Sequence, residues 1–273
     1  MVLEHVNLSR ILETAVVAAR LAGQRAMEEM DFLKVDVKNG AELVTQADQK
    51  CQTIIIDRIK ETYPDHGFIA EEGTAGKLFK QTPRGQEQIW WVIDPIDGTN
   101  NFAHKMPIFT VSIAAMYEGA PIAGVVFDPA TDSMFTAVKD GKAQLNGRRI
   151  TASEDEITKF SSITIDSHFG DKIPKWAYEL ILKTRFRNLG TTALHLAYVA
   201  SGALIGSIVC GPKLWDIAAG AFIAESAGAV ITNHHNQKLF PIDLENYNSE
   251  PMGIVAANKK IHAELIDLIK ASE

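Results

Sequence analysis

The chain has 273 residues, of which 46% are hydrophobic and 22% are charged, and its formal net charge is −7 at pH 7. These values are typical of a soluble globular protein with one large domain or two modest ones. The acidic balance argues against a general nucleic-acid binder, and the two cysteines, Cys51 and Cys210, are too far apart in the sequence to suggest a disulfide framework or a zinc–thiolate site.

The start of the chain, MVLEHVNLSR, lacks the basic and apolar regions of a signal peptide. The most apolar stretch, residues 217–224, is far too short to span a bilayer. We therefore expect a cytoplasmic protein that has no membrane partner, and the low cysteine content agrees with a reducing compartment.

The first part of the chain mixes helices with an antiparallel run of strands. Apolar residues at helical spacing predict helices over residues 9–30 and 46–62. Strands are predicted at residues 67–72 and 89–93, with a polar surface excursion over residues 73–88 between them. From residue 108 to residue 150 short strands alternate with turns, and Asp140-Gly141 and Asn146-Gly147 are hairpin signals.

After about residue 160 the pattern changes to alternating strands and helices. The predicted strands cover residues 161–168, 204–210, 229–232 and 253–256, and the predicted helices cover residues 173–184, 191–201, 214–227 and 259–271. This change indicates an N-terminal α+β half (residues 1–160) and a C-terminal α/β half (residues 161–273) with a site between them.

The sequence WVIDPIDGTNNF places two carboxylates, Asp94 and Asp97, at the exit of a buried strand. The proline between them fixes its own φ and removes an amide donor, and Gly98 permits a sharp or left-handed turn. Carboxylate oxygens and the carbonyl of Ile96 can ligate a hard divalent cation. A helix that starts at Thr99 would offer free amides to a phosphate. The same residues can also form an ordinary solvated turn.

Other acids stand at the ends of predicted elements. Asp48 begins a helix, Glu71 and Glu72 end a short strand, and Asp216 begins the apolar helix WDIAAGAFIAESAG. Taken alone, Asp48, Glu71 and Asp216 are each more simply explained by a structural role, and a carboxylate at a helix start, as at Asp48 and Asp216, stabilises the helix dipole.

Together five segments resemble the inositol monophosphatase family, within the lithium-sensitive, magnesium-dependent phosphatases that also include the fructose-1,6-bisphosphatases. The matching segments are LVTQADQK (43–50), FIAEEG (68–73), WVIDPIDGTNNF (91–102), GTTALHLAYVASG (190–202) and LWDIAAG (214–220). They occur in the family order over nearly the whole chain. The resemblance implies a layered αβαβα sandwich, mixing α+β and α/β parts, and a homodimer.

The resemblance also implies a set of metal ligands. Glu71, Asp94 and the carbonyl of Ile96 would hold one Mg²⁺, and Asp94, Asp97 and Asp216 would hold a second. A third, weaker ion would lie near Glu71. Lithium inhibition, by replacement of one magnesium, is a further expectation of the family.

Catalytic roles follow from the same resemblance. Thr99, with Asp48 or Glu71, would orient and deprotonate the attacking water, and the amides of Gly98 and Thr99 would hold the phosphate. The substrate would be bordered by Gly190, Thr191 and Thr192 together with Asp97 and Asp216.

Three further positions match the family less simply. Lys38 corresponds to a family lysine near the site, in a segment that is one residue shorter here. Arg187 corresponds to an arginine that borders the pocket or the dimer interface. Val209 stands seven residues before Asp216, where the animal inositol phosphatases place a glutamate that accepts bonds from inositol hydroxyls. A valine cannot accept a hydrogen bond.

The predicted function is therefore Mg²⁺-dependent hydrolysis of a small phosphomonoester, nominally inositol monophosphate, by a metal-activated water. The alternatives within the superfamily are fructose 1,6-bisphosphate, 3′-phosphoadenosine 5′-phosphate and NADP, and the change at Val209 is compatible with them. An alternative of another class is a binding or regulatory protein that keeps the fold and acts through partners.

Overall fold

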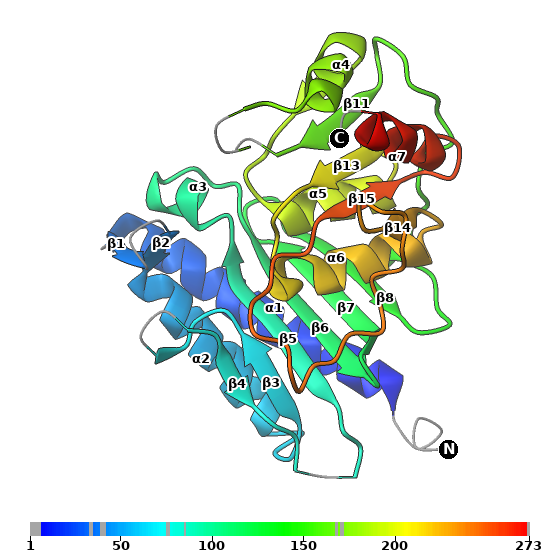
Figure 1. Ribbon diagram of the computed structural model, residues 1–273. Helices are drawn as coiled ribbons and strands as arrows, with labels where there is room; N and C mark the ends of the chain where they lie inside the picture. The colour runs from blue at the N-terminus through cyan, green and yellow to red at the C-terminus, as the bar shows by residue number, and fades with distance from the viewer. Residues whose placement is uncertain are drawn as a thin grey trace.

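The chain folds into five alternating layers of helix and sheet (Figure 1). The computed structural model describes residues 7–32, 35–38, 42–74, 77–84, 86–166, 169 and 172–271. Its α-helices are α1 (Leu8–Glu29), α2 (Gln46–Lys60), α3 (Thr99–Ala103), α4 (Lys175–Lys183), α5 (Thr192–Ala200), α6 (Leu214–Ser226) and α7 (His262–Lys270), and a 3₁₀ turn, η2 (Met30–Phe32), follows α1.

The strands form two large sheets and one two-stranded ribbon. The ribbon pairs β1 (Val35–Lys38) with β2 (Glu42–Thr45). An eight-stranded sheet has the order β10-β9-β8-β7-β6-β5-β3-β4, and its strands are β3 (Gly67–Ala70), β4 (Phe79–Gln81), β5 (Trp90–Asp97), β6 (Thr110–Tyr117), β7 (Ala120–Asp128), β8 (Ser133–Val138), β9 (Gln144–Leu145) and β10 (Arg148–Arg149). A five-stranded sheet has the order β12-β11-β13-β15-β14, and its strands are β11 (Ser162–Ile165), β12 (Arg185–Arg187), β13 (Gly206–Val209), β14 (Val230–Thr232) and β15 (Ile254–Ala257).

Strand β5 shows why the layers stack as they do. All eight of its residues are buried, which is expected of a strand covered on both faces. Trp91 and Ile93 pack into the core beneath α1 and α2, whereas Trp90 and Val92 pack into the core beneath α5 and α6. The side-chain period of two thus joins one apolar run to two separate cores.

The five-stranded sheet is divided between two cores in the same way. Ile208 and Val255 pack with residues of α4 and α7, and Val209 and Ile254 pack with residues of α5 and α6. The α5–α6 pair is therefore the middle layer between the two sheets, and α1–α2 and α4–α7 are the outer layers (Figure 1). The predicted αβαβα sandwich is confirmed.

The predicted long helices and the antiparallel run of strands are also present, with ends that differ by a few residues. The surface excursion predicted over residues 73–88 is wrong in part, because it contains the edge strand β4. Strand β12 was likewise not predicted. Each has only three residues, which is too few to leave a periodic signal. Residues 167–168 of the strand predicted to end at residue 168 lie outside the described part of the chain.

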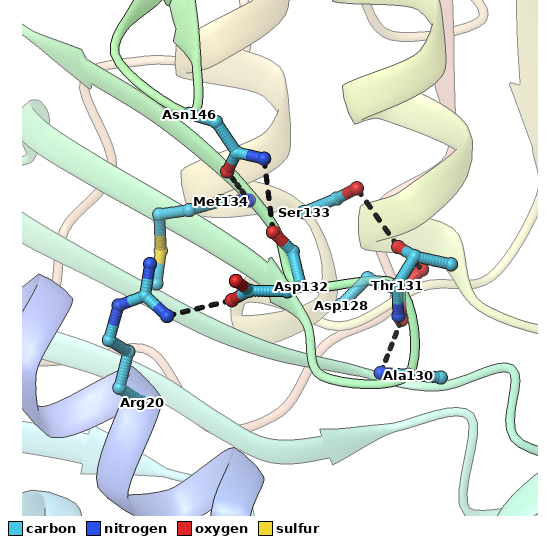
Figure 2. Close-up of polar contacts among 8 residues, drawn as sticks. All are labelled: Arg20, Asp128, Ala130, Thr131, Asp132, Ser133, Met134 and Asn146. Carbon is cyan, nitrogen blue, oxygen red and sulfur yellow. Dashed lines mark hydrogen bonds and ion pairs between the residues drawn. The ribbon is translucent and has the colours of Figure 1, made fainter.

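The hairpin from β7 to β8 is closed by a buried aspartate (Figure 2). Asp128 accepts hydrogen bonds from the amides of Ala130 and Thr131, at 3.0 and 3.3 Å, and from the Thr131 hydroxyl at 2.8 Å. Asn146, from the next turn, accepts the amide of Met134 at 2.8 Å. The turn is thus held by its own side chains.

Among the described helices, none is both long enough and apolar enough to cross a membrane.

Candidate active site

The exit of β5 departs from a regular strand. Asp94 lies opposite Ser112 on β6 and Asp97 lies opposite Thr110, so β5 carries one extra residue in this interval, which is a β-bulge. The Asp94 carboxylate accepts the amide of Ile96 at 3.0 Å and closes the turn.

Gly98 then turns the chain into the short helix α3. Its φ is +102°, in the left-handed region, and a Cβ atom there would lie 3.1 Å from the carbonyl oxygen of Ile108. A side chain at this position would be strained by its backbone and crowded by its neighbour. The glycine predicted from the sequence to allow a sharp turn therefore does so.

Three aspartates converge at this turn. Asp94, Asp97 and Asp216 each offer a carboxylate oxygen, and these oxygens all lie within 4.8 Å of one another. Asp216 arrives from the first turn of α6, where its Oδ2 accepts the amide of Lys213 at 2.6 Å. Asp94 and Asp97 are 2% and 7% exposed. We name these three residues the acidic cluster.

Burial and mutual repulsion dominate the electrostatics of the acidic cluster. Burial, with added repulsion from Glu71, Asp97 and Asp216, holds the pKa of Asp94 well above its usual range. Burial raises the pKa of Asp97 to about 6, although donated hydrogen bonds oppose the shift. Burial and the charge of Asp97 raise the pKa of Asp216 to about 7. A buried all-oxygen set of carboxylates that repel one another could bind a hard divalent cation, because the cation would neutralise the repulsion.

Asp97 has a second set of contacts, at the start of α5. Its carboxylate accepts the Thr191 hydroxyl, the amide of Ala193 at 2.7 Å and the amide of Thr192 at 3.3 Å. The hydroxyl of Thr110 lies 3.4 Å away and also donates to it. Asp97, at the end of β5 in the eight-stranded sheet, thus accepts free amides at the N-terminus of α5. The sequence prediction placed Thr191 and Thr192 beside the substrate, and it missed Thr110 and the Ala193 amide.

Asp48 and Thr99 meet beside the acidic cluster. Asp48 is fully buried in the first turn of α2, and its Oδ1 lies 3.3 Å from the Thr99 hydroxyl. The same hydroxyl lies 3.0 Å from the carbonyl oxygen of Ile96. The structure therefore brings together the two residues that the resemblance pairs for handling a water proton.

Glu71 stands at the end of β3, directly beside β5. The two strands are parallel, Ala70 is opposite Ile93, and the Glu71 amide donates to the Ile93 carbonyl at 3.3 Å. Parallel neighbours place their C-terminal side chains at one sheet edge. Gln52 of α2 holds this segment by exchanging hydrogen bonds with the backbone of Glu72 at 2.6 and 2.9 Å. No pattern in the sequence predicts that clamp.

The segment before α5 is held against α3. Gly190 has a φ of +72°, and a Cβ atom there would lie 2.7 Å from the Asn101 amide nitrogen. Asn101 donates to the carbonyls of Ile108 and Leu189, at 2.8 and 2.7 Å. His195 accepts the Leu189 amide at 2.8 Å, and burial lowers the pKa of His195 to about 4, so this ring is neutral.

Two predicted site residues, Val209 and Arg187, lie apart from this arrangement, and the side chain of a third, Lys38, is outside the described part of the chain. The Val209 side chain is buried in the core between α5, α6 and the five-stranded sheet. Arg187 is exposed on the edge strand β12 and donates to the carbonyl of Phe186 at 2.9 Å. Lys38 lies on β1, whose side chains are outside the described part of the chain. Near Val209 a carboxylate does occur just after the adjacent strand β11, where Asp166 accepts the Cys210 amide at 2.5 Å.

The comparison with known proteins decides the family. The sequence pattern of the inositol monophosphatase family matches residues 7–273. The chain belongs to this family. Membership supports a phosphatase activity, and the acidic cluster could bind the metal ions on which such enzymes generally depend.

Several relatives resemble the chain along most of its length. It is 32% identical over 272 residues to the inositol-1-monophosphatase of Mesorhizobium japonicum, a match that covers 96% of this chain and 97% of the relative. It is 33% identical over 270 residues to the Nus factor SuhB of Escherichia coli K12, covering 95% and 98%. The solved IMPase of Thermotoga maritima is 30% identical with a TM-score of 0.83, covering 96% and 98%.

Proposed function

We propose that the chain is a magnesium-dependent phosphatase of small phosphomonoesters, in which water attacks phosphorus directly. The observation that carries this proposal is the convergence of three carboxylates, two buried and one half-buried, with Glu71 beside them, in a member of the inositol monophosphatase family. A phosphomonoester dianion would be repelled by this acidic cluster unless cations were bound there.

The residues that would hold two to three Mg²⁺ ions are Glu71, Asp94, the carbonyl of Ile96, Asp97 and Asp216. Bound magnesium would neutralise phosphate charge, lower the pKa of a water and stabilise the leaving alkoxide. The oxygen-only donor set supports magnesium over zinc, which takes nitrogen and sulfur ligands more often.

The Asp48–Thr99 pair would handle the proton of the attacking water. The 3.3 Å distance from Thr99 Oγ1 to Asp48 Oδ1 allows the threonine proton to pass to the carboxylate while Thr99 Oγ1 accepts a proton from the water. Asp48 is buried and therefore shielded from solvent protons. The amides of Gly98 and Thr99, at the start of α3, would hold phosphate oxygens, with Gly190, Thr191 and Thr192 along the substrate.

Inositol monophosphate is the nominal substrate, supported by the name of the Mesorhizobium relative. The burial of Val209 opposes a strict preference for inositol, because that position offers no acceptor to a ring hydroxyl. Fructose 1,6-bisphosphate, 3′-phosphoadenosine 5′-phosphate and NADP are the alternative substrates.

A panel of phosphomonoesters, assayed for phosphate release with magnesium and with EDTA, tests the proposal. The panel contains inositol 1-phosphate, fructose 1,6-bisphosphate, 3′-phosphoadenosine 5′-phosphate and NADP. One substrate hydrolysed much faster than the others, only with magnesium, would identify the reaction. Slow and even hydrolysis would indicate a generalist pocket, and no hydrolysis by folded protein would contradict the phosphatase proposal.

A second candidate function is a binding or regulatory role through a partner. The name of the Escherichia coli relative, a Nus factor, favours it. An Asp94→Asn variant separates the two functions, since it would abolish hydrolysis and leave the outer surface unchanged. A cellular phenotype that this variant rescues fully would require the second function.

We also propose a homodimer, supported by apolar residues exposed on α4. Tyr178, Ile181 and Leu182 are 55%, 38% and 84% exposed, and their spacing places them on one helical face. Sedimentation of the wild type and of a Leu182→Glu variant tests this state. A wild type that sediments as a monomer would contradict it.

A further inference from the structure

A segment far from β5 in the sequence closes over the start of α6. We name residues 243–252 the strap. Between β14 and β15 the chain leaves the five-stranded sheet, passes in front of the eight-stranded sheet, and returns to β15 (Figure 1). The strap meets the residues just before α6 in two places, where Lys213 Nζ donates to the Ser249 carbonyl at 2.8 Å and the Met252 amide donates to the Pro212 carbonyl at 2.8 Å.

Tyr247 makes the most specific contact of the strap. Its hydroxyl oxygen accepts the amide of Leu214, the first residue of α6, at 2.9 Å, and the hydroxyl donates to the Glu250 carbonyl at 3.3 Å. Its ring packs edge-on against Trp215, with 6.3 Å between centroids. Only 6% of Tyr247 is exposed, so the bond to Leu214 is shielded from water.

This contact completes the N-terminus that carries Asp216. The first amides of a helix have no partner inside the helix. Asp216 accepts the Lys213 amide, and Tyr247 accepts the Leu214 amide, so two adjacent amides are satisfied by two different side chains. Without the tyrosine hydroxyl, the Leu214 amide would lose its partner, and the first turn of α6 would be free to shift together with Asp216.

The other side of the strap is fixed to the eight-stranded sheet. Lys80 of β4 donates to the carbonyls of Glu245 and Tyr247, at 2.6 and 3.0 Å, and its ammonium lies 5.9 Å from the Trp90 ring centroid. β4 pairs with β3, the strand that ends beside Glu71. The strap therefore connects the sheet that carries Glu71 and Asp94 to the helix that carries Asp216.

We propose that Tyr247 is a positioning residue for the metal site: through Leu214 it fixes Asp216 relative to Asp94 and Asp97 and so raises the affinity for a divalent cation. This inference rests on the metal-binding part of the proposed function. A purely structural clamp would change stability alone, whereas a positioning residue also changes the affinity for the ion.

The test compares two tyrosine-to-phenylalanine variants. Tyr247→Phe removes the hydroxyl and keeps the ring against Trp215. Tyr63→Phe is the control, because Tyr63 is also partly buried and its ring stacks on His66, with 4.5 Å between centroids, just beyond the C-terminal end of α2. Equilibrium binding of Mn²⁺, followed by electron paramagnetic resonance of the free ion, reports affinity without any assay of hydrolysis.

We expect Tyr247→Phe to raise the Kd for Mn²⁺ about three- to tenfold, the effect of one lost buried hydrogen bond. The Mg²⁺ concentration for half-maximal hydrolysis rises by the same factor, while kcat at saturating Mg²⁺ stays within about twofold. Tyr63→Phe leaves the Kd for Mn²⁺ unchanged.

An unchanged Kd for Mn²⁺ in Tyr247→Phe, despite a lower thermal midpoint, would overturn the proposal. If that variant does not fold, Lys80→Met replaces it, and the same rise in Kd is expected because the strap loses its other anchor. A wild type that binds Mn²⁺ and hydrolyses nothing would refute the phosphatase and leave the role of Tyr247 to the binding data. A wild type that binds no Mn²⁺ would overturn both.

Discussion

Two strands of the large sheet, β5 and β7, carry the same local motif near their C-terminal ends. Each has a buried aspartate followed by proline, Asp94-Pro95 within the last residues of β5 and Asp128-Pro129 at the end of β7, and the two aspartates are 2% and 3% exposed. Each carboxylate accepts the amide two residues further on, at 3.0 Å in both turns. The backbone chemistry of the two turns is therefore the same.

The two turns differ in where their remaining contacts come from. Within the described part of the chain, the hydrogen bonds of Asp128 all come from residues no more than three positions away, and the next acid, Asp132, points outward to Arg20 at 2.7 Å (Figure 2). At β5 the next acid, Asp97, turns inward to the start of α5, and Asp216 arrives from α6. A buried aspartate is thus not a functional signal by itself, and the convergence of acids from distant segments is.

The largest expected effect is on catalysis at the β5 turn. Asp94→Asn keeps an oxygen for the Ile96 amide and removes one charge from the acidic cluster, so turnover with saturating magnesium should fall by about 10³-fold or more. Asp128→Asn is the matched control and should leave kcat and the magnesium requirement unchanged. Phosphate release from the best substrate measures both. If Asp94→Asn kept more than about a tenth of the wild-type turnover, the metal assignment would be wrong.

The next effect concerns stability without metal. A carboxyl whose folded pKa is raised stabilises the fold at low pH and loses this contribution as pH rises through the folded pKa. With the pKa of Asp97 raised from 3.8 to about 6 and that of Asp216 from 3.8 to about 7, wild-type protein in EDTA should lose stability from about pH 4 to about pH 8. Asp94→Asn should flatten this loss, because a buried carboxyl with a raised pKa no longer titrates.

Thermal midpoints of the wild type and Asp94→Asn, measured in EDTA across this pH range, test the prediction. Histidines with lowered pKa values, such as His195, also change stability with pH, but both proteins contain them, so the difference isolates the acidic cluster. We expect Asp94→Asn to melt several degrees higher than the wild type at pH 8, and magnesium to stabilise only the wild type strongly. Parallel curves in EDTA would contradict the raised pKa values.

Local patterns in the sequence predicted much of the fold around the β5 turn. The apolar run before Asp94 predicted β5, helical spacing predicted α1, and the turn at Gly98 followed from glycine and proline chemistry. The contacts that complete the site could not be predicted in this way. Gln52 clamps Glu72 and Tyr247 caps Leu214 across 20 and 33 residues, and such pairs exist only after the layers have packed.

The fate of Val209 shows the same limit. Its chemistry was clear from the sequence, since a valine accepts no hydrogen bond. The direction of the Val209 side chain could not be predicted, because it depends on which face of β13 packs against α5 and α6. In the structure the side chain is buried on that face. The edge strands β4 and β12 were missed because three residues are too few to show a periodic pattern.

A smaller effect is expected at the β7 turn. Asp128→Asn keeps an acceptor for the amides of Ala130 and Thr131, but its amide group cannot accept the Thr131 hydroxyl. The variant should therefore lose about 1 kcal/mol of unfolding free energy, with no change in its response to magnesium. Urea denaturation with and without magnesium measures both quantities. A magnesium-dependent change would mean that this turn communicates with the acidic cluster.

The smallest effect is expected for the surface acid beside that turn. Asp132 pairs with Arg20, but their side chains are 71% and 50% exposed, so water and salt screen the interaction. Arg20 also lies over the Phe127 ring at 5.3 Å, and Arg20→Met would retain most of that apolar contact. We expect Arg20→Met to change the free energy of unfolding, measured by urea denaturation at moderate salt, by less than about 0.5 kcal/mol. A loss of more than about 1 kcal/mol of unfolding free energy would show that Asp132, the second acid of the β7 turn, has a structural role. A negligible loss would mean that the second acid of an aspartate–proline turn matters only when it points inward toward other acids.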